Sequence, residues 1–247
     1  MKTRYFAWTR CGWSICVVTM IVAGDLHAKN VSKDDAAANV ATRGVHEEAG
    51  RILNSIQSTV YQHDTEIDEK AGTYRCDCSG FVGYVLNRTT AKDDPTGPLG
   101  DKKKRPLAMD YEKFFEKAPT KNGGDGRWQQ VAKLADARPG DVIAWRHEKP
   151  MPGNTGHVVI VDQRPVVEED GLVRVVVIDS TTKPQVDDTR AKGTSGVGRG
   201  SMWFVVDAEG HATGYVRGSR TAKPKNEAIS IGRALPAKKN AGTRRAA

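Results

Sequence analysis

The sequence predicts an α+β fold in which helices from the first half of the chain pack on an antiparallel sheet from the second half. Up to about residue 118, apolar residues recur at spacings of three and four, which is typical of amphipathic helices. From about residue 141 onward, short runs rich in β-branched and aromatic residues alternate with Gly, Pro and Asp, which is typical of strands joined by turns.

The N-terminal residues predict a secretory signal. Three basic residues precede a short apolar stretch from Cys11 to Gly24, and the small residue Ala28 follows. We therefore expect residues 1–28 to be a signal peptide, with cleavage after Gly24 as a second option and an uncleaved anchor as the alternative. The stretch is short for a membrane span, so after cleavage we expect no stable membrane insertion and a location in the periplasm or in the extracellular, cell-wall space.

The remaining residues predict a single domain over 36–235, between a flexible lead-in over 29–35 and a disordered basic tail over 236–247. The periodicity predicts helices over 35–62, from about residue 78, and over 107–118. Strands are predicted at 141–146, 157–163, 172–179, 201–207, 213–218 and 227–232.

The formal net charge of the 247 residues is +8. A basic exported protein suits an anionic polymer such as a cell wall, but solvated basic loops are an equally good interpretation, and both stay open. Basic residues are not interleaved with aromatic ones, so we expect no nucleic-acid partner.

Removal of the signal would leave two of the four cysteines, Cys76 and Cys78. A bridge between residues two apart is strained and closes almost no loop, so a structural disulfide is not expected. A four-cysteine zinc site is excluded by number, and no histidine lies nearby in a ligand spacing, so we expect no metal and no other cofactor. The thiols are then either reactive or small buried groups at the start of a helix.

Cys78 is the better candidate nucleophile of the two. It stands at the expected N-terminus of its helix, where unpaired backbone N–H groups and the helix dipole favour a thiolate. Cys76 precedes the helix and gains less from both. We expect Cys76 to be a silent neighbour, with a redox partner as the alternative.

A cysteine nucleophile usually needs a base, and five histidines follow the predicted signal: His46, His63, His147, His157 and His211. His157 begins a predicted strand and shares a face with Val159 and Val161. A histidine between apolar residues must find a partner there. It is a candidate base, with a satisfied structural histidine as the alternative.

Asp179 is the candidate partner of this histidine. If the turn between the strands at 157–163 and 172–179 centres on Glu168, His157 lies directly opposite Asp179 and on the same face. A carboxylate at that position could orient the imidazole and stabilise its charged form.

A rival register places a tight turn at Asp170–Gly171. It would run Pro165 into the strand, where a ladder tolerates proline poorly, so we prefer the turn at Glu168. A slip of one residue would turn Asp179 to the other face of the sheet.

Three segments in this order resemble the NlpC-type cell-wall peptidases and the related CHAP amidases: DCSGFVGYVL (77–86), RPGDVIAWR (138–146) and GHVVIVD (156–162). The resemblance covers roughly residues 60 to 182. It implies a papain-like fold, with Cys78 as nucleophile, His157 as base and Asp179 as the third member of a triad. It also implies a cysteine hydrolase that cleaves amide bonds in peptidoglycan stem peptides through a thioester, and we expect a monomer.

Some features depart from the family pattern. The family often has a Tyr and a Gly-Gly pair ahead of the cysteine; Tyr61 and Tyr74 are candidates for the Tyr, and the Gly-Gly pair is missing. The segment 181–204 extends beyond the usual core, either as a flap with Arg199 or Trp203 at the substrate, or as a glycine-rich loop followed by a core strand. The candidate substrate-binding residues are Tyr61, Tyr74, Ser79 and Trp203.

Three functions follow from these patterns. The first is an exported cysteine hydrolase of cell-wall peptides. The second is an acyl-transferring or amide-cleaving enzyme that uses the same triad on another substrate. The third is a non-catalytic module that binds the cell wall on the same fold. The joint presence of Cys78, His157 and a carboxylate candidate favours an enzyme over the third.

Overall fold

The computed structural model describes residues 33–90, 97–99, 105–120 and 127–235. The predicted signal peptide, residues 29–32 of the lead-in, and the basic tail lie outside the described residues, and the domain bounds stay predictions. Within the described ranges, no helix is both long enough and apolar enough to cross a membrane.

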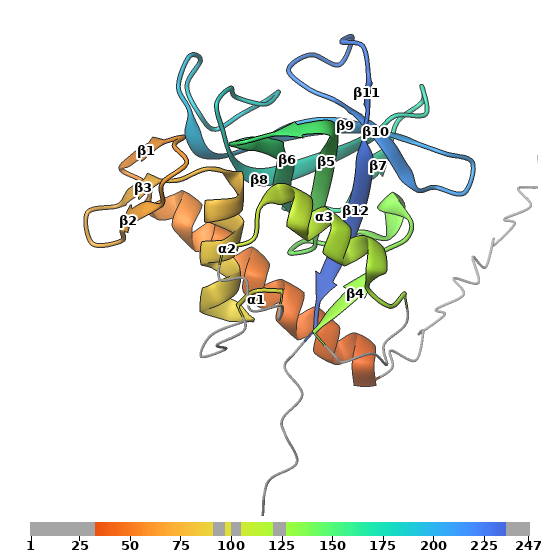
Figure 1. Cartoon of the computed structure of the whole chain (residues 1–247), viewed down its shortest axis with the longest axis horizontal. Coiled ribbons are helices and arrows are strands. Elements are labelled where there is room, and N and C mark those ends of the chain that lie inside the picture. Colours follow the sequence, from red (N-terminus) through yellow and green to blue (C-terminus); the bar gives the residue numbers. More distant parts are fainter. Residues whose placement is uncertain (1–32, 91–96, 100–104, 121–126, 236–247) are drawn as a thin grey trace, which may run out of the picture. The chain divides into compact units, whose positions relative to one another are not determined.

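The α+β prediction is confirmed, because helices from the first half of the chain pack on an antiparallel sheet. The described residues form the helices α1 (Lys33–Ser55), α2 (Cys78–Thr89) and α3 (Ala108–Lys117), with a short 3-10 helix at Leu134–Asp136. Figure 1 shows α1, α2 and α3 along one side of strands from the second half of the chain.

The large sheet has the strand order β11-β10-β9-β8-β6-β5-β12-β4, and β7 pairs with β8 at its side. Every neighbouring pair in it is antiparallel. Its strands are β4 (Trp128–Gln130), β5 (Val142–Met151), β6 (Asn154–Val161), β7 (Val166–Val167), β8 (Val173–Thr181), β9 (Gly196–Val206), β10 (Ala212–Val216), β11 (Lys225–Asn226) and β12 (Ala228–Ala234).

A small sheet of three strands was not predicted. It consists of β1 (Ser58–Val60), β2 (Glu66–Asp68) and β3 (Thr73–Arg75) in the order β1-β3-β2. The helix predicted over 35–62 therefore ends early, at Ser55. The backbone N–H groups of Gln57 and Ser58 both donate to Gly72 O, at 2.9 and 3.2 Å, so the chain leaves the helix to pair with a distant turn. Local periodicity cannot show such a long-range pairing.

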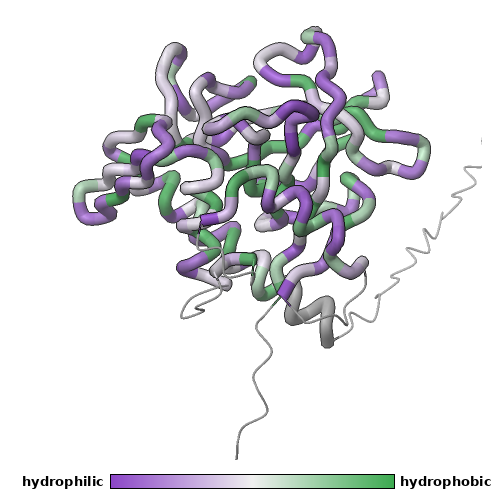
Figure 2. Tube along the Cα trace, viewed as in Figure 1, coloured by the Kyte–Doolittle hydropathy of each residue, from purple (hydrophilic) through white to green (hydrophobic). Residues whose placement is uncertain are grey.

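The strand alternation places two apolar clusters on opposite faces of the large sheet. Along β6, Val158 and Ile160 belong to the cluster beneath the helices, which includes Phe81 of α2. Val159 and Val161 belong to the other cluster. Figure 2 shows apolar segments gathered in the interior and hydrophilic segments in the outer loops. His157 falls on the face of Val159 and Val161, as expected.

The register of β6 against β8 differs from the predicted one by two residues. Ile160 pairs with Ile178 and Val161 with Val177, whereas the prediction placed His157 directly opposite Asp179. A shift of two residues keeps every side chain on its face, so His157 and Asp179 still share one, as diagonal neighbours.

The turn that joins these strands also lies later than predicted. Glu168 N donates to Leu172 O and Gly171 N donates to Glu168 O, so the turn covers residues 168–171 and is not centred on Glu168. Pro165 does not enter a ladder there, because it falls in the break between β6 and β7. The objection to the rival turn was therefore wrong: an interrupted strand accommodates both the proline and the later turn.

Candidate functional site

Cys78 is the first residue of α2, and Asp77 caps that helix. Asp77 Oδ1 accepts hydrogen bonds from the Gly80 N–H at 2.7 Å and from the Ser79 hydroxyl at 3.0 Å. These bonds satisfy donors at the helix start and fix the chain direction on either side of the cysteine. Gly80 packs against the loop before β2, since a Cβ there would lie 2.4 Å from Thr65 Oγ1.

The Cys78 thiol is protonated at neutral pH in this structure. Burial raises its pKa to about 12, and the charges of Asp77 and Asp179 raise it further, while the N–H groups of Val158 and Ser79 partly oppose them. The backbone N–H group at the helix start lowers the pKa of this thiol as expected, but desolvation and two carboxylates outweigh it, so the net shift is upward. Nucleophilic attack by Cys78 therefore needs a base that removes its proton.

His157 and Asp179 meet as expected. The His157 Nε2–H donates to Asp179 Oδ2 at 2.7 Å, and both residues are buried. Because Nε2 holds this bond, Nδ1 is the nitrogen left to accept a proton. Burial lowers the pKa of His157 below its ordinary value of 6.5, although the bond to Asp179 raises it. The imidazole is therefore neutral and able to act as a base at neutral pH.

The Cys78 thiol and this imidazole come from adjoining elements. The backbone N–H of Val158, the residue after His157, lowers the pKa of the Cys78 thiol. Gly156 sits directly before the histidine with a φ of +144°, and a Cβ there would lie 1.9 Å from Trp145 O. Glycine is therefore required at this position for β6 to approach β5 closely. The Trp145 ring packs against the imidazole, with ring centroids 5.1 Å apart.

Asp179 is held by more partners than the sequence suggested. Arg190 Nη2 donates to Asp179 Oδ1 at 2.8 Å, and the Gln185 amide donates to Asp179 Oδ2 at 2.8 Å. Burial raises the pKa of Asp179, but the hydrogen bond from His157 and the charge of Arg190 outweigh it, so this pKa lies below its ordinary value. Asp179 is thus ionised and fixed on two sides.

Arg190 is itself buried and held by two aspartates. Its side chain is 2% exposed, and it also pairs with Asp188, with Nη2 2.6 Å from Asp188 Oδ2. Gly198 on β9 leaves room for it, since a Cβ there would lie 2.5 Å from Arg190 Nε. Arg190 and Gln185 lie in the segment 181–204 that was considered as a flap. The part of that segment before β9 packs on the buried carboxylate, and the part from Gly196 onward is strand.

Two adjoining pockets surround the cysteine and the histidine. The Cys78 pocket, of about 230 Å³, is lined by Cys78, Ser79 and Asp77 among others. The His157 pocket, of about 370 Å³, is lined by His157 and by residues of β10 and β11. The two pockets share the wall residues Tyr61, His63, Gly153 and Gly156. We refer to these two adjoining pockets together as the cleft; Cys78 lines one of them and His157 lines the other.

The structure brings some predicted substrate-binding residues to this cleft. Tyr61 lines both pockets and Ser79 lines the Cys78 pocket. Tyr74 and Trp203 line neither: the Tyr74 hydroxyl hydrogen-bonds with Ser55 Oγ at 2.9 Å, and the Trp203 indole N–H donates to a carboxylate 3.0 Å away. Both are therefore placed as structural contacts.

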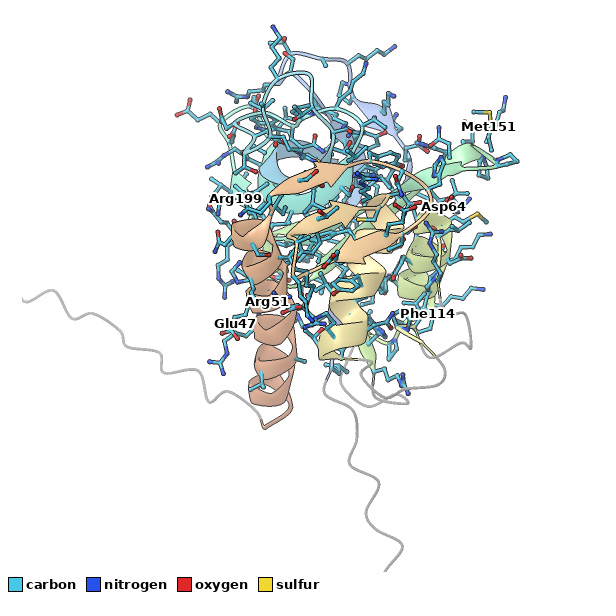
Figure 3. All side chains as sticks on the ribbon, turned by 90° about the vertical axis from the view of Figure 1, so that its left-hand side faces the viewer. Glu47, Arg51, Asp64, Phe114, Met151 and Arg199 are labelled. Carbon is cyan, nitrogen blue, oxygen red and sulfur yellow. The ribbon has the colours of Figure 1, made fainter. Side chains whose placement is uncertain are left out.

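Arg199 also lies away from the cleft. It reaches Asp162 at 3.7 Å, and Asp162 in turn contacts His46 of α1 at 3.0 Å. Figure 3 shows Arg199 beside the end of α1 next to the small sheet, whereas Met151 lies at the tip of the β5–β6 hairpin. This chain of contacts ties β9 to the first helix.

Sequence reasoning missed two residues that line the Cys78 pocket. The His63 side chain is 61% exposed, yet it lines both pockets, and its Nδ1 lies 3.4 Å from Asp77 Oδ2. Arg105 donates to Asp77 Oδ2 at 2.8 Å and to the His63 carbonyl at 2.6 Å. Both residues come from irregular segments, where no periodic pattern signals a position.

A metal site does not explain this cleft. Among the described residues, Asp207, Glu209 and His211 bring ligand atoms within 4.8 Å of one another, on an exposed turn between β9 and β10. Asp207 Oδ1 already accepts the backbone N–H groups of Glu209 and His211, at 3.1 and 2.8 Å. These bonds close the turn and account for the cluster.

Comparisons with known proteins add little to this geometry. A scan against models of protein families finds no match. A search of curated proteins also finds no match. One solved structure, described as the crystal structure of a wild type endolysin LysIME-EF1, aligns over 80% of this chain and 66% of its own chain, at 14% identity and a TM-score of 0.35. A likeness this weak carries no argument about the function of this chain.

Proposed function

We propose that this protein is an exported cysteine hydrolase that cleaves amide bonds in peptidoglycan stem peptides. Cys78 is the nucleophile, His157 the base and Asp179 the residue that orients the base. The observation that carries this proposal is the buried contact of 2.7 Å between His157 and Asp179, beside a cleft that also contains Cys78. The peptidoglycan substrate rests on the resemblance of three sequence segments to cell-wall peptidases with a papain-like fold.

The first half of the reaction forms a thioester. Cys78 Sγ attacks the carbonyl carbon of the scissile amide while the thiol proton passes to His157 Nδ1. Asp179 stabilises the resulting imidazolium, since its carboxylate accepts the Nε2–H and is ionised. The imidazolium then gives its proton to the leaving amine as the C–N bond breaks.

The second half releases the product. Water attacks the thioester carbonyl carbon and His157 takes its proton, so that a carboxylic acid leaves and the Cys78 thiol is restored. Backbone N–H groups at the start of α2, including that of Cys78, are suited to hold the oxyanion in both halves, because they lie at the positive end of the helix dipole.

A neutral thiol beside a neutral imidazole makes proton transfer part of the attack. Burial raises the pKa of Cys78 and lowers that of His157, so the two groups do not exchange a proton at rest. Asp179 and the substrate must together favour the transfer. This role resembles that of a base acting on a serine hydroxyl more than that of a preformed thiolate.

The test is digestion of purified peptidoglycan, followed by mass spectrometry of the soluble products. We expect the wild-type protein to release peptides that have gained one water at a single amide bond. The matched variants are Cys78→Ala and Cys76→Ala, because the two cysteines are two residues apart and both are buried. We expect the first variant to release nothing and the second to behave as wild type.

Other outcomes identify the rival functions. Products that contain an acceptor amine in place of water indicate an acyl-transferring enzyme. Binding to the wall without any cleavage, equal for wild type and Cys78→Ala, indicates a binding module and contradicts the proposal.

A further inference from the structure

The His157 pocket has an unbalanced positive charge. Its charged lining residues are Arg217 of the β10 end and Lys225 of β11, and its lining contains no aspartate or glutamate. The remaining polar lining comes from histidines, Tyr61 and Asn154, among others. A pocket next to a catalytic imidazole thus presents cations without a matching carboxylate.

Arg217 is held in place but not neutralised. Its Nη2 donates to Thr181 Oγ1 at the end of β8 and lies 3.4 Å from the Lys183 carbonyl. Over the part of the chain that the structure describes, neither Arg217 nor Lys225 forms an ion pair, and both hydrogen bonds of Arg217 come from Nη2 rather than from Nε or Nη1. The guanidinium is half-buried and held through Nη2, so its remaining N–H donors can bind a ligand in the pocket.

The nearby carboxylates are already engaged. Asp179 accepts from His157, Gln185 and Arg190. Glu227, which follows β11, accepts from His147 at 2.9 Å and from the backbone of Glu148 at 3.1 Å. Neither can reorient toward Arg217 without leaving its own donors unpaired in a partly buried place, which is costly. These two carboxylates are therefore not available to form an ion pair with Arg217.

The positive charge of Arg217 affects the pKa values of His157 and Tyr61. Burial lowers the pKa of His157, and the positive charge of Arg217 lowers it further, while Asp179 raises it. Tyr61 lies on the shared wall of the two pockets. Burial raises the pKa of its hydroxyl, and the positive charge of Arg217 opposes this by lowering it. Arg217 and His157 also line the same pocket, so a substrate that fills this pocket meets both side chains.

We propose that Arg217 and Lys225 form a subsite for a carboxylate of the peptide substrate, on the His157 side of the cleft. This rests on the proposed function, and it specifies that function as cleavage of an acidic peptide. The Nε–H and Nη1–H groups of Arg217 can each donate one charge-assisted hydrogen bond to a carboxylate oxygen, while Nη2 stays anchored to Thr181. The ammonium of Lys225 supplies a second positive charge in the same pocket. An amidated substrate of the same shape leaves the cations unpaired and binds less well.

The test uses binding, so that it does not depend on turnover. The protein carries Cys78→Ala, and the probe is a set of soluble disaccharide–peptide fragments released from peptidoglycan by a glycan-cleaving enzyme. Half of the sample keeps its free carboxylates, and the other half is converted to primary amides. Affinities for both halves are measured by titration calorimetry, with the thermal unfolding of each variant as a check of folding.

We expect the free carboxylate form to bind at least about tenfold more tightly than the amide form. Arg217→Gln should abolish this preference, and Arg217→Lys should restore part of it. Lys223→Gln is the matched control, because Lys223 is an exposed lysine close in sequence that lines neither pocket, and it should leave the preference unchanged.

Equal binding of the two forms, no binding of either, or a preference that survives Arg217→Gln overturns the subsite. Failure of the proposed function is recognised separately. If peptidoglycan is hydrolysed but the carboxylate has no effect on binding, only the subsite is wrong. If the carboxylate preference is present and nothing is hydrolysed by the protein with an intact Cys78, only the proposed reaction is wrong.

Discussion

Two buried aspartate–arginine pairs lie in different parts of the large sheet. Asp179 pairs with Arg190 at 2.8 Å, and Asp141 pairs with Arg233 at 2.8 Å. Both aspartates are fully buried. Asp179 also accepts the imidazole N–H of His157, whereas Asp141 accepts the backbone N–H of Arg138.

The two carboxylates have opposite pKa shifts. Burial raises the pKa of Asp141, and its arginine does not fully compensate. Burial also raises the pKa of Asp179, but His157 and Arg190 together reverse it and lower the pKa. An arginine partner alone therefore does not decide the direction of the pKa shift of a buried carboxylate. The two pairs therefore differ in the imidazole that bonds to Asp179, and the proposed function rests on this difference.

The largest effect is expected when each aspartate is removed in turn. Asp179→Ala leaves His157 without its orienting acceptor, so we expect kcat for peptidoglycan hydrolysis to fall by about a thousandfold. Asp179→Asn removes the negative charge that stabilises the imidazolium and places an amide NH2 where donors now point, so it should lose at least as much activity. Asp141→Ala is the matched control, and its kcat per folded molecule should stay within about threefold of wild type. Equal losses for both alanine variants would contradict the comparison.

The second largest effect is expected on the free energy of unfolding when the Asp141–Arg233 pair is broken. Arg233→Gln leaves Asp141 buried without its cation, and we expect the free energy of unfolding to fall by about 3 to 5 kcal/mol. Urea unfolding at neutral pH measures it. The folded fraction should retain its peptidoglycan activity, because Arg233 lines neither pocket of the cleft. A loss of activity without a loss of stability would show that this pair belongs to the site as well.

A smaller effect is expected from Arg190→Gln. The charge of Arg190 contributes to the lowering of the pKa of His157, after burial. Its removal should therefore shift the acidic limb of the kcat/KM profile to higher pH, and lower kcat by about tenfold. Arg199→Gln, which removes a cation on β9 that contacts Asp162, should change neither. An acidic limb that stays in place would mean that Arg190 acts on the fold alone.

The smallest effect is the pH dependence of stability. Asp179 has a lowered folded pKa, so its stabilisation is present above 3.8 and is lost as the pH falls through the folded value. Asp141 has a raised folded pKa, so its contribution is present below 3.8 and is lost as the pH rises through the folded value.

The difference in the free energy of unfolding between wild type and Asp179→Asn should therefore decrease as the pH falls. The corresponding difference between wild type and Asp141→Asn should increase as the pH falls. Urea unfolding at several values between about pH 3 and 6 measures both, with expected changes of about 1 to 2 kcal/mol. The same sign for both variants would show that the two carboxylates do not differ in this way.

The candidate triad could be found in the sequence because it lies on regular elements. Cys78 begins a helix, and the faces of His157 and Asp179 follow from the alternation of strands. Even a register wrong by two residues kept the two side chains on one face. The turn and the register could not be fixed, since the break at Pro165 depends on how β7 folds back on β8.

The residues that support the triad could not be predicted. Arg190 and Gln185 come from a loop without a periodic pattern, and only the packed structure shows that Gly198 leaves room for the guanidinium. Arg217 lies at the end of a short strand, and its place in the cleft depends on the order of the whole sheet. The raised pKa of Cys78 also depends on burial, which helix position does not reveal.

The most direct test of the account is alkylation of the thiols by iodoacetamide, followed by peptide mass spectrometry across about pH 5 to 9. We expect Cys78, which lines the pocket, to react faster than the fully buried Cys76. The Cys78 rate in wild type should rise to a plateau with a midpoint below pH 6.5, the ordinary value that burial lowers for His157. In His157→Ala this step should vanish. A Cys78 rate that rises steadily with pH and is the same in both proteins would contradict a thiol activated by His157.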